Sequence, residues 1–399
     1  MSSLPPPGDA ARAHSARLRQ VIQSEIIQSG IFAAGGAIPF SRFMELCLYA
    51  PGLGYYSAGA AKFGPAGDFV TAPELGPLFA ACIADALAPV LRQVGPDAQF
   101  VEIGGGSGAF AEVVLKRLLA LDALPSRYAI LEPSADLRER QKQRIGERLN
   151  PLLGDLVEWL DAPPQEPWSG VLFANEVVDA LPTPRFTLRD GEVFEEHVAL
   201  DGEGRFIRQD RPADALLAAA VRHVERDLGA PLPDGYRSEL LPQLPYWLQA
   251  VMGDMQAGAM LFVDYGYARR EYYQPQRREG TLRAFRQHHV VADLYDWPGL
   301  QDLTASVDFT ALAEAGTGAG FDLAGYCSQA SFLLGNGLAE RLQEAEARAR
   351  DEAALQRLRH ETKQLTLPEA MGERFQAMGF ARDVEFGAAF IAGDLSHRL

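Results

Sequence analysis

The clearest hydrophobic pattern lies between residues 99 and 119, where an apolar run ends in a glycine cluster. Phe100, Val101 and Ile103 have the aromatic and β-branched character of a short buried strand. From Phe110 onward, apolar residues recur every three to four positions, which is typical of a helix. The segment therefore predicts a strand, a tight turn and a helix.

The same alternation of apolar strands and helix-like segments continues along the chain. Strands are expected at 128–132, 171–174 and 259–266, with a further short strand or turn within 152–157. Strands that alternate with helices are typical of a parallel sheet with helices on both faces. The pattern therefore predicts an α/β fold with a mostly parallel, doubly wound sheet.

The period of the pattern drops to two between residues 185 and 208, where Asp190-Gly191 predicts the turn of a β-hairpin. Two helical stretches, 213–227 and 238–256, follow this antiparallel segment. We therefore expect an insertion in the parallel sheet. The expected domains are a disordered leader and helical cover over 1–95, a core with a C-terminal helical region over 96–184 and 257–399, and an inserted substrate or partner region over 185–256.

The ends of the chain carry weaker signals. Residues 1 to about 15 are rich in proline, alanine and polar residues, and we expect them to be disordered. Ser41 is the expected N-cap of a helix. The apolar segment 386–391 is the expected final edge strand.

Composition limits the possible classes of function. The 399 residues are 47% hydrophobic and 23% charged, as is ordinary for a globular enzyme. A net charge of −16 without a basic stripe argues against a nucleic-acid partner, while a basic protein remains acceptable. The sequence suggests no membrane insertion, no metal site and no signal peptide. We therefore expect a cytoplasmic protein.

The glycine cluster fits two cofactor motifs. Gly104-x-Gly106-x-x-Ala109 matches the dinucleotide fingerprint, in which a phosphate sits at the helix N-terminus. Glu102-x-Gly104-x-Gly106-x-Gly108 resembles the first motif of class I S-adenosylmethionine methyltransferases. A carboxylate at Glu102 suits a cationic cofactor, whereas it would repel a pyrophosphate. The methyltransferase interpretation is therefore favoured.

Acidic residues follow several of the expected strands, at the edge where open α/β sheets bind ligands. Glu132 follows the second strand, where a carboxylate can accept hydrogen bonds from a ribose diol. Asp155 could reach an adenine amino group, or it could simply cap a loop. Asp264 follows the fifth strand. These acids extend the candidate cofactor site beyond the glycine turn.

Asn175, Glu176 and Asp179 follow the fourth strand, close to where a methyl acceptor would lie. A guanidinium group needs planar carboxylate partners, and two acids could align it. Alternatively, these acids lie at a helix N-terminus and only interact favourably with the helix dipole. His288 and His289 could also orient a substrate, although structural histidines are an equal alternative.

Six segments, in this order along the chain, form a combined pattern. They are Gly67-Asp68-Phe69-x-Thr71-x-Pro73-Glu74, Val101 to Gly108, Leu131-Glu132-Pro133-Ser134, Asn175-Glu176-x-x-Asp179-Ala180-Leu181-Pro182, Asp264-Tyr265-Gly266 and Asp302-Leu303-Thr304-Ala305-x-Val307-Asp308-Phe309. Together they resemble the MidA-type methyltransferases, a family that includes the mitochondrial arginine methyltransferase assisting assembly of respiratory complex I. The resemblance implies a class I methyltransferase fold, S-adenosyl-L-methionine as cofactor, Thr71 and Glu74 as further cofactor residues, and arginine methylation of a protein, possibly a complex I subunit.

Two other functions stay open at this point. The protein could be a non-catalytic assembly factor that binds the cofactor only to stabilise a docking surface. It could also be an NAD-dependent oxidoreductase, although Glu102 and the absence of a clear hydride-transfer dyad disfavour that class.

Overall fold

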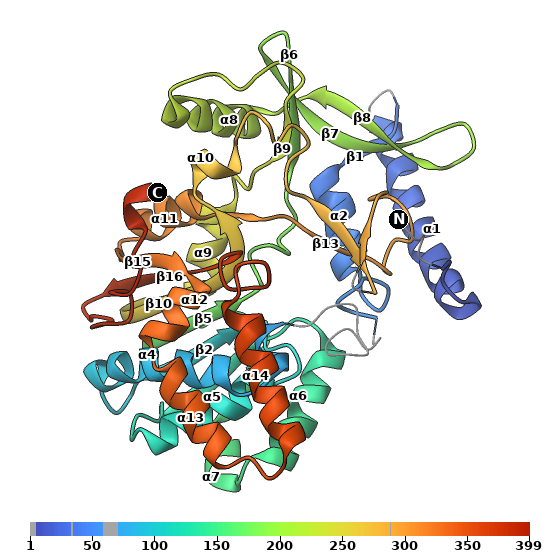
Figure 1. Cartoon of the computed structure of the whole chain (residues 1–399). Helices are drawn as coiled ribbons and strands as arrows, with labels where there is room; N and C mark the ends of the chain where they lie inside the picture. The colour runs from blue at the N-terminus through green and yellow to red at the C-terminus, as the bar shows by residue number, and fades with distance from the viewer. Residues whose placement is uncertain (1–4, 33–34, 59–70, 288) are drawn as a thin grey trace. The chain divides into compact units, whose positions relative to one another are not determined.

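The computed structural model describes residues 5–32, 35–58, 71–287 and 289–399 (Figure 1). The motif residues Gly67, Asp68 and Phe69 and the candidate His288 lie outside the described residues. The chain forms two compact units. The first unit comprises Met1–Phe69, Asp179–Gln243 and Arg269–Asp308, and the second comprises Val70–Val178, Leu244–Ala268 and Phe309–Leu399.

The second unit is built on a mostly parallel sheet with the strand order β15-β16-β10-β5-β2-β3-β4. The strands from β10 to β4 are parallel, whereas β16 is antiparallel to both of its neighbours. The predicted α/β fold is therefore confirmed. The strands are β2 (Gln99–Ile103), β3 (Arg127–Leu131), β4 (Val157–Leu160), β5 (Trp168–Asn175), β10 (Met255–Tyr267), β15 (Asp322–Ser328) and β16 (Phe375–Arg382).

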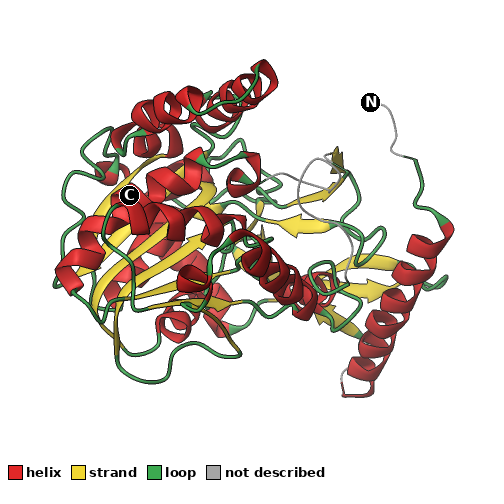
Figure 2. Ribbon diagram, turned by 90° about the horizontal axis from the view of Figure 1, so that it is seen from below, coloured by secondary structure: helices red, strands yellow, loops and turns green. Residues whose placement is uncertain are grey.

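Helices flank this sheet on both faces (Figure 2). Between sheet and helices, Phe110 stacks on Phe173 with ring centroids 4.2 Å apart, and Phe100 stacks on Tyr128 at 4.8 Å. The helices of the second unit are α3 (Ala72–Leu75), α4 (Leu78–Val94), α5 (Ala109–Ala120), α6 (Ala135–Arg148), α7 (Pro151–Gly154), α9 (Leu244–Met252), α11 (Phe309–Gly318), α12 (Gln329–Gly335), α13 (Leu338–Ala347), α14 (Glu352–Thr366) and the 3₁₀ helix η1 (Ser396–Arg398).

The first unit contains the predicted hairpin. Asp190 and Gly191 both have positive φ, 51° and 79°, as a two-residue hairpin turn requires. A five-stranded sheet has the order β1-β7-β6-β9 with β8 beside β7, and a smaller sheet has the order β12-β11-β13. The elements are α1 (Asp9–Phe32), β1 (Ala37–Pro39), α2 (Phe40–Tyr49), β6 (Arg185–Arg189), β7 (Glu192–Leu200), β8 (Phe206–Pro212), α8 (Ala215–Leu228), β9 (Arg237–Glu239), α10 (Arg269–Tyr272), β11 (Arg283–Arg286), β12 (His289–Val291), β13 (Asp302–Thr304) and β14 (Val307–Asp308).

Several expectations about the N-terminal half need correction. The disordered leader was expected to reach about residue 15, but α1 begins at Asp9, because its alanine- and arginine-rich start has high helix propensity. Helix α2 begins at Phe40 after Pro39, so Ser41 lies inside it and is not its N-cap. Helix α4, expected in the cover, packs in the core of the second unit because it is apolar on nearly all sides.

Later elements also differ from expectation. Of the strand or turn expected within 152–157, the structure has the turn, at 155–156 after the short helix α7, and β4 (Val157–Leu160) begins at the end of that range. The helix expected over 238–256 is shorter, because β9 precedes α9 and β10 begins at Met255.

The final edge strand expected at 386–391 is wrong, since β16 is the last strand and lies inside the sheet. Glycines on the sheet explain the difference. A Cβ on Gly379 would lie 2.4 Å from the ring of Phe390, and one on Gly325 would also lie 2.4 Å from that side chain. Phe390 therefore covers the sheet instead of extending it.

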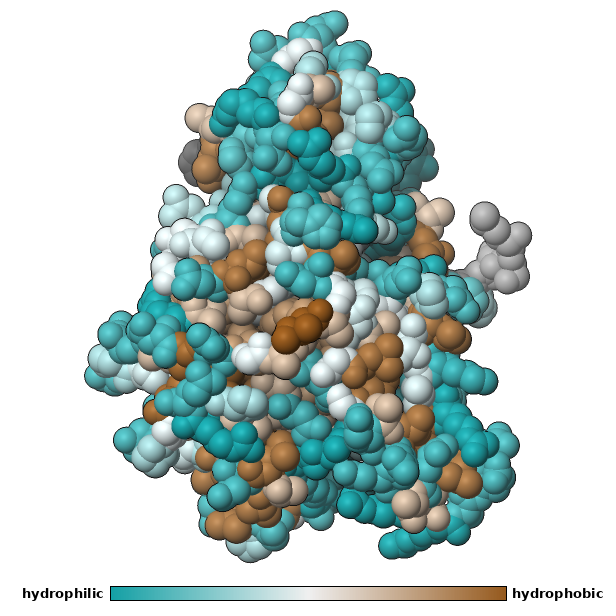
Figure 3. Space-filling model, turned by 60° about the vertical axis from the view of Figure 1, so that its left-hand side comes forward, coloured by the Kyte–Doolittle hydropathy of each residue, from teal (hydrophilic) through white to brown (hydrophobic). Residues whose placement is uncertain are grey.

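Within the described parts of the chain, every helix is too short or too polar to cross a bilayer. Hydrophilic side chains surround a central gathering of apolar ones on the face drawn in Figure 3. Among the large apolar side chains of the second unit, the most exposed are Ile391 at 78%, Tyr246 at 66%, Leu152 at 62% and Leu334 at 58%.

Candidate functional site

The parallel strands of the second unit bring four sequence positions to one edge of the sheet. Ile103 on β2 pairs with Leu131 on β3 and with Ala174 on β5, and Val263 on β10 pairs with Asn175. Gly104, Glu132 and Glu176 each follow their strand directly, and Asp264 follows Val263 within β10. These four residues are therefore neighbours at one edge of the sheet.

The glycine turn follows β2 and leads into α5. Gly104, Gly106 and Gly108 have φ angles of 70°, 51° and 80°, a conformation that residues with a side chain rarely adopt. The Gly104 amide donates to the Leu131 carbonyl at 3.0 Å, which joins the turn to β3. A Cβ at Gly106 would meet no described atom within 4 Å. The turn therefore leaves open space beside its backbone.

Glu102 lies beneath this turn and is only 3% exposed. The hydroxyl of Tyr128 donates to its carboxylate at 2.7 Å. Burial raises the pKa of Glu102 to about 7, the hydrogen bond from Tyr128 opposes this rise, and the negative charge of Glu132 adds to it. Glu102 is therefore a buried acid that titrates near neutral pH.

Glu132 follows β3 and is 4% exposed. Its carboxylate accepts from the Ser134 amide at 2.9 Å and from Gln141 Nε2 at 3.4 Å. The Gln141 amide nitrogen also donates to the Gly106 carbonyl at 2.9 Å, and its oxygen accepts from the Trp159 indole at 2.8 Å. Gln141 thus connects the acid of β3 to the glycine turn.

The sequence-based search missed Gln141, although a signal was present. Leu137, Gln141 and Ile145 are the buried residues of α6 and recur every four positions. A polar residue on the apolar face of an amphipathic helix needs a hydrogen-bonding partner. Here the partners belong to the candidate cofactor site.

Thr71 and Glu74 lie at the short helix α3. Thr71 occupies the N-cap position, without a side-chain capping bond to a described residue. Glu74 accepts a hydrogen bond from the Ser107 hydroxyl in the glycine turn, and Arg144 donates to the same hydroxyl at 3.3 Å. The structure therefore places Glu74 beside the candidate site.

Asp155 lies at the edge of the sheet formed by the amino ends of the parallel strands, opposite to the edge that carries Glu132. Because β4 begins at Val157 and runs parallel to β3, Asp155 precedes the amino end of β4. Asp155 was expected within a strand or turn over 152–157, and the structure places it in the turn between α7 and β4. Asp161 is the acid that follows β4, and it forms an ion pair of 2.5 Å with Arg138.

Asn175 is the last residue of β5, and Glu176 begins the turn that follows. Glu176 has a φ of 52°, an uncommon value for a non-glycine residue, and its carboxylate accepts from Asn175 Nδ2 at 3.2 Å. Asp264, 1% exposed, accepts from the amides of Val177 and Val178 at 3.2 and 3.0 Å. Asp264 therefore holds the turn that presents Glu176.

The remaining candidates belong to the first unit. Asp179 is 4% exposed, and its carbonyl accepts from the Ala305 amide at 2.9 Å. His289 is exposed and makes a 2.5 Å hydrogen bond with the Gln287 carbonyl. Among the residues with described positions, no three potential ligands are grouped for a metal ion.

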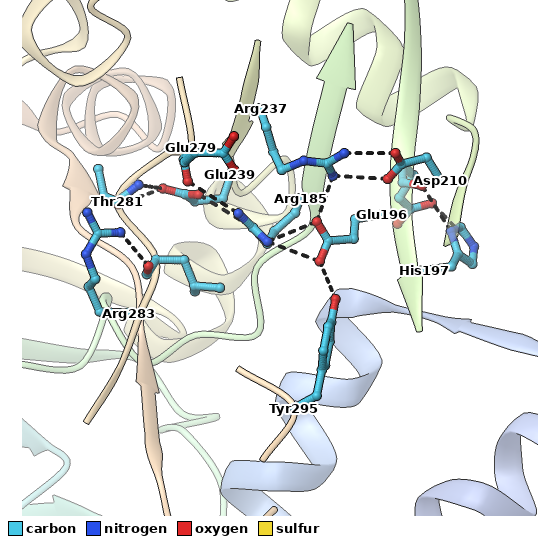
Figure 4. Close-up of polar contacts among 12 residues, drawn as sticks. Arg185, Glu196, His197, Asp210, Arg237, Glu239, Glu279, Thr281, Arg283 and Tyr295 are labelled. Carbon is cyan, nitrogen blue, oxygen red and sulfur yellow. Dashed lines mark hydrogen bonds and ion pairs between the residues drawn. The ribbon is translucent and has the colours of Figure 1, made fainter. Parts of the chain in front are cut away.

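A buried network of charges in the first unit was not expected from the sequence (Figure 4). Glu196, fully buried, accepts from Arg185 at 2.9 Å, from Arg237 at 2.7 Å and from the Tyr295 hydroxyl at 2.7 Å. Arg237 also binds Asp210 at 2.8 Å. The residues come from separate segments, so no local motif reveals them. The pairing of opposite charges offsets the cost of removing them from water.

Comparison with known proteins identifies the class to which this fold and site belong. Residues 82–327 match the model of a family described as S-adenosyl-L-methionine-dependent methyltransferases. A protein from Burkholderia thailandensis, solved bound to S-adenosyl-homocysteine, is 40% identical, with a TM-score of 0.90 and 100% of both chains covered. The chain therefore belongs to this methyltransferase family, and its cofactor is S-adenosyl-L-methionine.

Two relatives that are named protein arginine methyltransferases also match most of the chain. The Drosophila melanogaster protein named protein arginine methyltransferase NDUFAF7 homolog, mitochondrial, is 30% identical over 371 residues, spanning 86% of this chain and 80% of that protein. The human NDUFAF7 protein arginine methyltransferase is 26% identical, spanning 85% and 79%. The resemblance to the family of the mitochondrial arginine methyltransferase is thereby confirmed.

The residues at the sheet edge fit the chemistry of this cofactor. The open side of Gly106 admits a ligand close to the backbone. Glu132 supplies a carboxylate suited to a ribose diol, and the neighbouring acids suit a cationic amino acid moiety. The site therefore offers acidic groups, as a positively charged methyl donor requires.

Proposed function

We propose that the protein transfers a methyl group from S-adenosyl-L-methionine to an arginine nitrogen of a protein acceptor. The observation that carries this proposal is the position of Glu176. Its strand, β5, lies directly beside β2, so Glu176 follows one strand and the glycine turn follows the next. A carboxylate there can bind a guanidinium group next to the methyl donor.

The chemistry requires positioning above all. The cofactor supplies a methyl group already activated on a sulfonium, so the carbon–sulfur bond breaks as the carbon–nitrogen bond forms, and sulfur keeps the electron pair. Glu176 would align the guanidinium by accepting its N–H groups and would take up the proton that the attacking nitrogen loses, so the methylated product keeps a single positive charge. The bonds from Asp264 to the turn would keep this carboxylate in place.

The names of the relatives support a protein acceptor, since they are called protein arginine methyltransferases. The net charge of −16 favours the approach of a basic acceptor. A respiratory complex I subunit remains a predicted partner. The cytoplasmic location also remains a prediction, whereas the relatives named above are mitochondrial proteins.

The test is transfer of labelled methyl groups to proteins of a cell extract, followed by mass spectrometry of the modified residues. We expect methylated arginine with the wild type and at least a tenfold lower rate with Glu176→Gln, while S-adenosyl-homocysteine still binds. Glu166→Gln is the matched control, because Glu166 is exposed in the same unit. Methylation of lysine, or of small molecules alone, would contradict the proposal.

A further inference from the structure

The first turn of α4 is capped by a side chain from a distant part of the chain. Glu361 on α14 is 1% exposed, and its Oε1 accepts a 2.6 Å hydrogen bond from the Leu78 amide. The Phe79 amide also bonds to this carboxylate. The N-cap of α4 is Pro77, which has no polar side chain of its own. Glu361 therefore satisfies amides that the start of a helix leaves unpaired.

Gly76 leaves the room for this contact. An ideal Cβ on Gly76 would lie 2.0 Å from Oε2 of Glu361 and 2.5 Å from its carboxyl carbon. The φ of Gly76 is 163°, which is extended backbone, so close approach and not conformation explains the glycine. The junction between α3 and α4 is thus shaped around the Glu361 carboxylate.

The same junction leads to the cofactor turn. Helix α3 ends at Leu75, directly before Gly76, and carries Glu74. Glu74 accepts the hydrogen bond from Ser107, which lies between Gly106 and Gly108 of the glycine turn. A continuous set of contacts therefore runs from α14 through the α3–α4 junction to the cofactor turn.

Burial of this acid is costly. It raises the pKa of Glu361 to about 7, while the bonds from the Leu78 and Phe79 amides oppose the rise. An apolar residue would pack α14 against α4 without this cost. Position 361 therefore carries a hydrogen-bond acceptor, although the packing of α14 against α4 does not require one.

We propose that Glu361 is a positioning residue for the S-adenosyl-L-methionine site. By fixing the α3–α4 junction, it holds Glu74 against Ser107 and keeps the glycine turn in its binding conformation. Glu74, Gly76 and Glu361 all lie outside residues 82–327, the part matched by the family model. The proposal concerns the cofactor and does not depend on the acceptor.

The first test measures binding of S-adenosyl-homocysteine by calorimetry and unfolding by urea on the same variants. We expect Glu361→Ala to weaken binding about fivefold, the effect of losing one helix cap. Glu361→Gln keeps an acceptor oxygen and should recover most of the affinity. Glu369→Ala removes an exposed carboxylate just beyond α14 and should change neither quantity.

Leu365→Ala distinguishes positioning from general stability. Leu365 is fully buried one turn after Glu361 on the same helix, so its truncation loosens the packing of α14 without removing the cap. We expect it to lower stability and leave the affinity unchanged. If Leu365→Ala weakens binding as much as Glu361→Ala does, or if Glu361→Ala leaves binding unchanged, the proposal is overturned.

Hydrogen exchange and a double-mutant cycle test the path itself. In Glu361→Ala, the Leu78 and Phe79 amides should exchange faster, and the loss of affinity should not add to that of Ser107→Ala. Strict additivity would overturn the path through Ser107. Gly76→Ala provides a second variant, since its methyl group displaces the carboxylate, and it should reproduce the weaker binding while Glu361 is present.

Discussion

The hydroxyl of Tyr128 on β3 donates a 2.7 Å hydrogen bond to the carboxylate of Glu102 on the adjacent strand β2. Both side chains are buried, and Tyr128 also stacks on Phe100. The acid of the methyltransferase motif is therefore part of the packed sheet, where its protonation is linked to folding.

The first prediction concerns this linkage. Burial raises the pKa of Glu102 from 4.5 to about 7, so the folded protein holds the proton more tightly than the unfolded chain. The contribution of Glu102 to the free energy of unfolding therefore falls as the pH rises from about 4.5 to 7 and is constant above. Between pH 5 and pH 8, the free energy of unfolding should therefore decrease by about 3 kcal/mol less in Glu102→Gln than in the wild type, as measured by urea unfolding. Equal pH profiles of the two proteins would contradict the buried acid.

The second prediction concerns Asp264. Asp264→Ala leaves the Val177 and Val178 amides without their acceptor and should lower the free energy of unfolding by about 3 kcal/mol. Asp264→Asn keeps an oxygen and should fold better, yet with slower methyl transfer because the turn is held less firmly. Asp254→Asn, exposed just before β10, is the control. Wild-type transfer rates in Asp264→Asn would disprove the role in holding the turn.

A third prediction concerns Gln141. Gln141→Ala removes the bonds to the Gly106 carbonyl and the Trp159 indole, so we expect weaker S-adenosyl-homocysteine binding by about tenfold. Calorimetry measures the affinity, and the emission of Trp159 reports its loss of a partner. Gln143→Ala, exposed on the same helix, should leave the affinity unchanged.

A fourth prediction compares Glu132 and Asp155, the two acids that the sequence suggested for binding the ribose and the adenine of the cofactor. Glu132→Ala should weaken S-adenosyl-homocysteine binding at least tenfold, because a carboxylate at the end of β3 can bind the ribose. Asp155→Ala should have no effect, since Asp155 lies at the opposite edge of the sheet. Equal losses of affinity, compared by calorimetry, would contradict the placement of Asp155.

Local patterns determined what the sequence could predict. The glycine turn was predictable because strand, glycines and helix are contiguous, and Glu132 was predictable because it directly follows a strand. The edge of the sheet at which Asp155 lies depends on where β4 begins, and the sequence pattern left 152–157 open between a strand and a turn. Gln141 and the network around Glu196 depend on contacts between distant segments, which no local motif records.

Strand β16 was also missed, because it is buried on both faces and lacks the alternation of a half-exposed strand. The residues that looked like a strand, around Phe390, instead pack over glycines of the sheet. In both cases tertiary packing decided between two apolar segments of similar composition.

The position of β16 has a consequence for synthesis on the ribosome. It pairs with one edge of β10, the 13-residue strand between β16 and β5, yet it is translated more than 100 residues later. During that interval the nascent chain exposes an unpaired edge of β10, open to association with other chains. Chaperone dependence of this protein should therefore be greatest before Phe375–Arg382 leaves the exit tunnel.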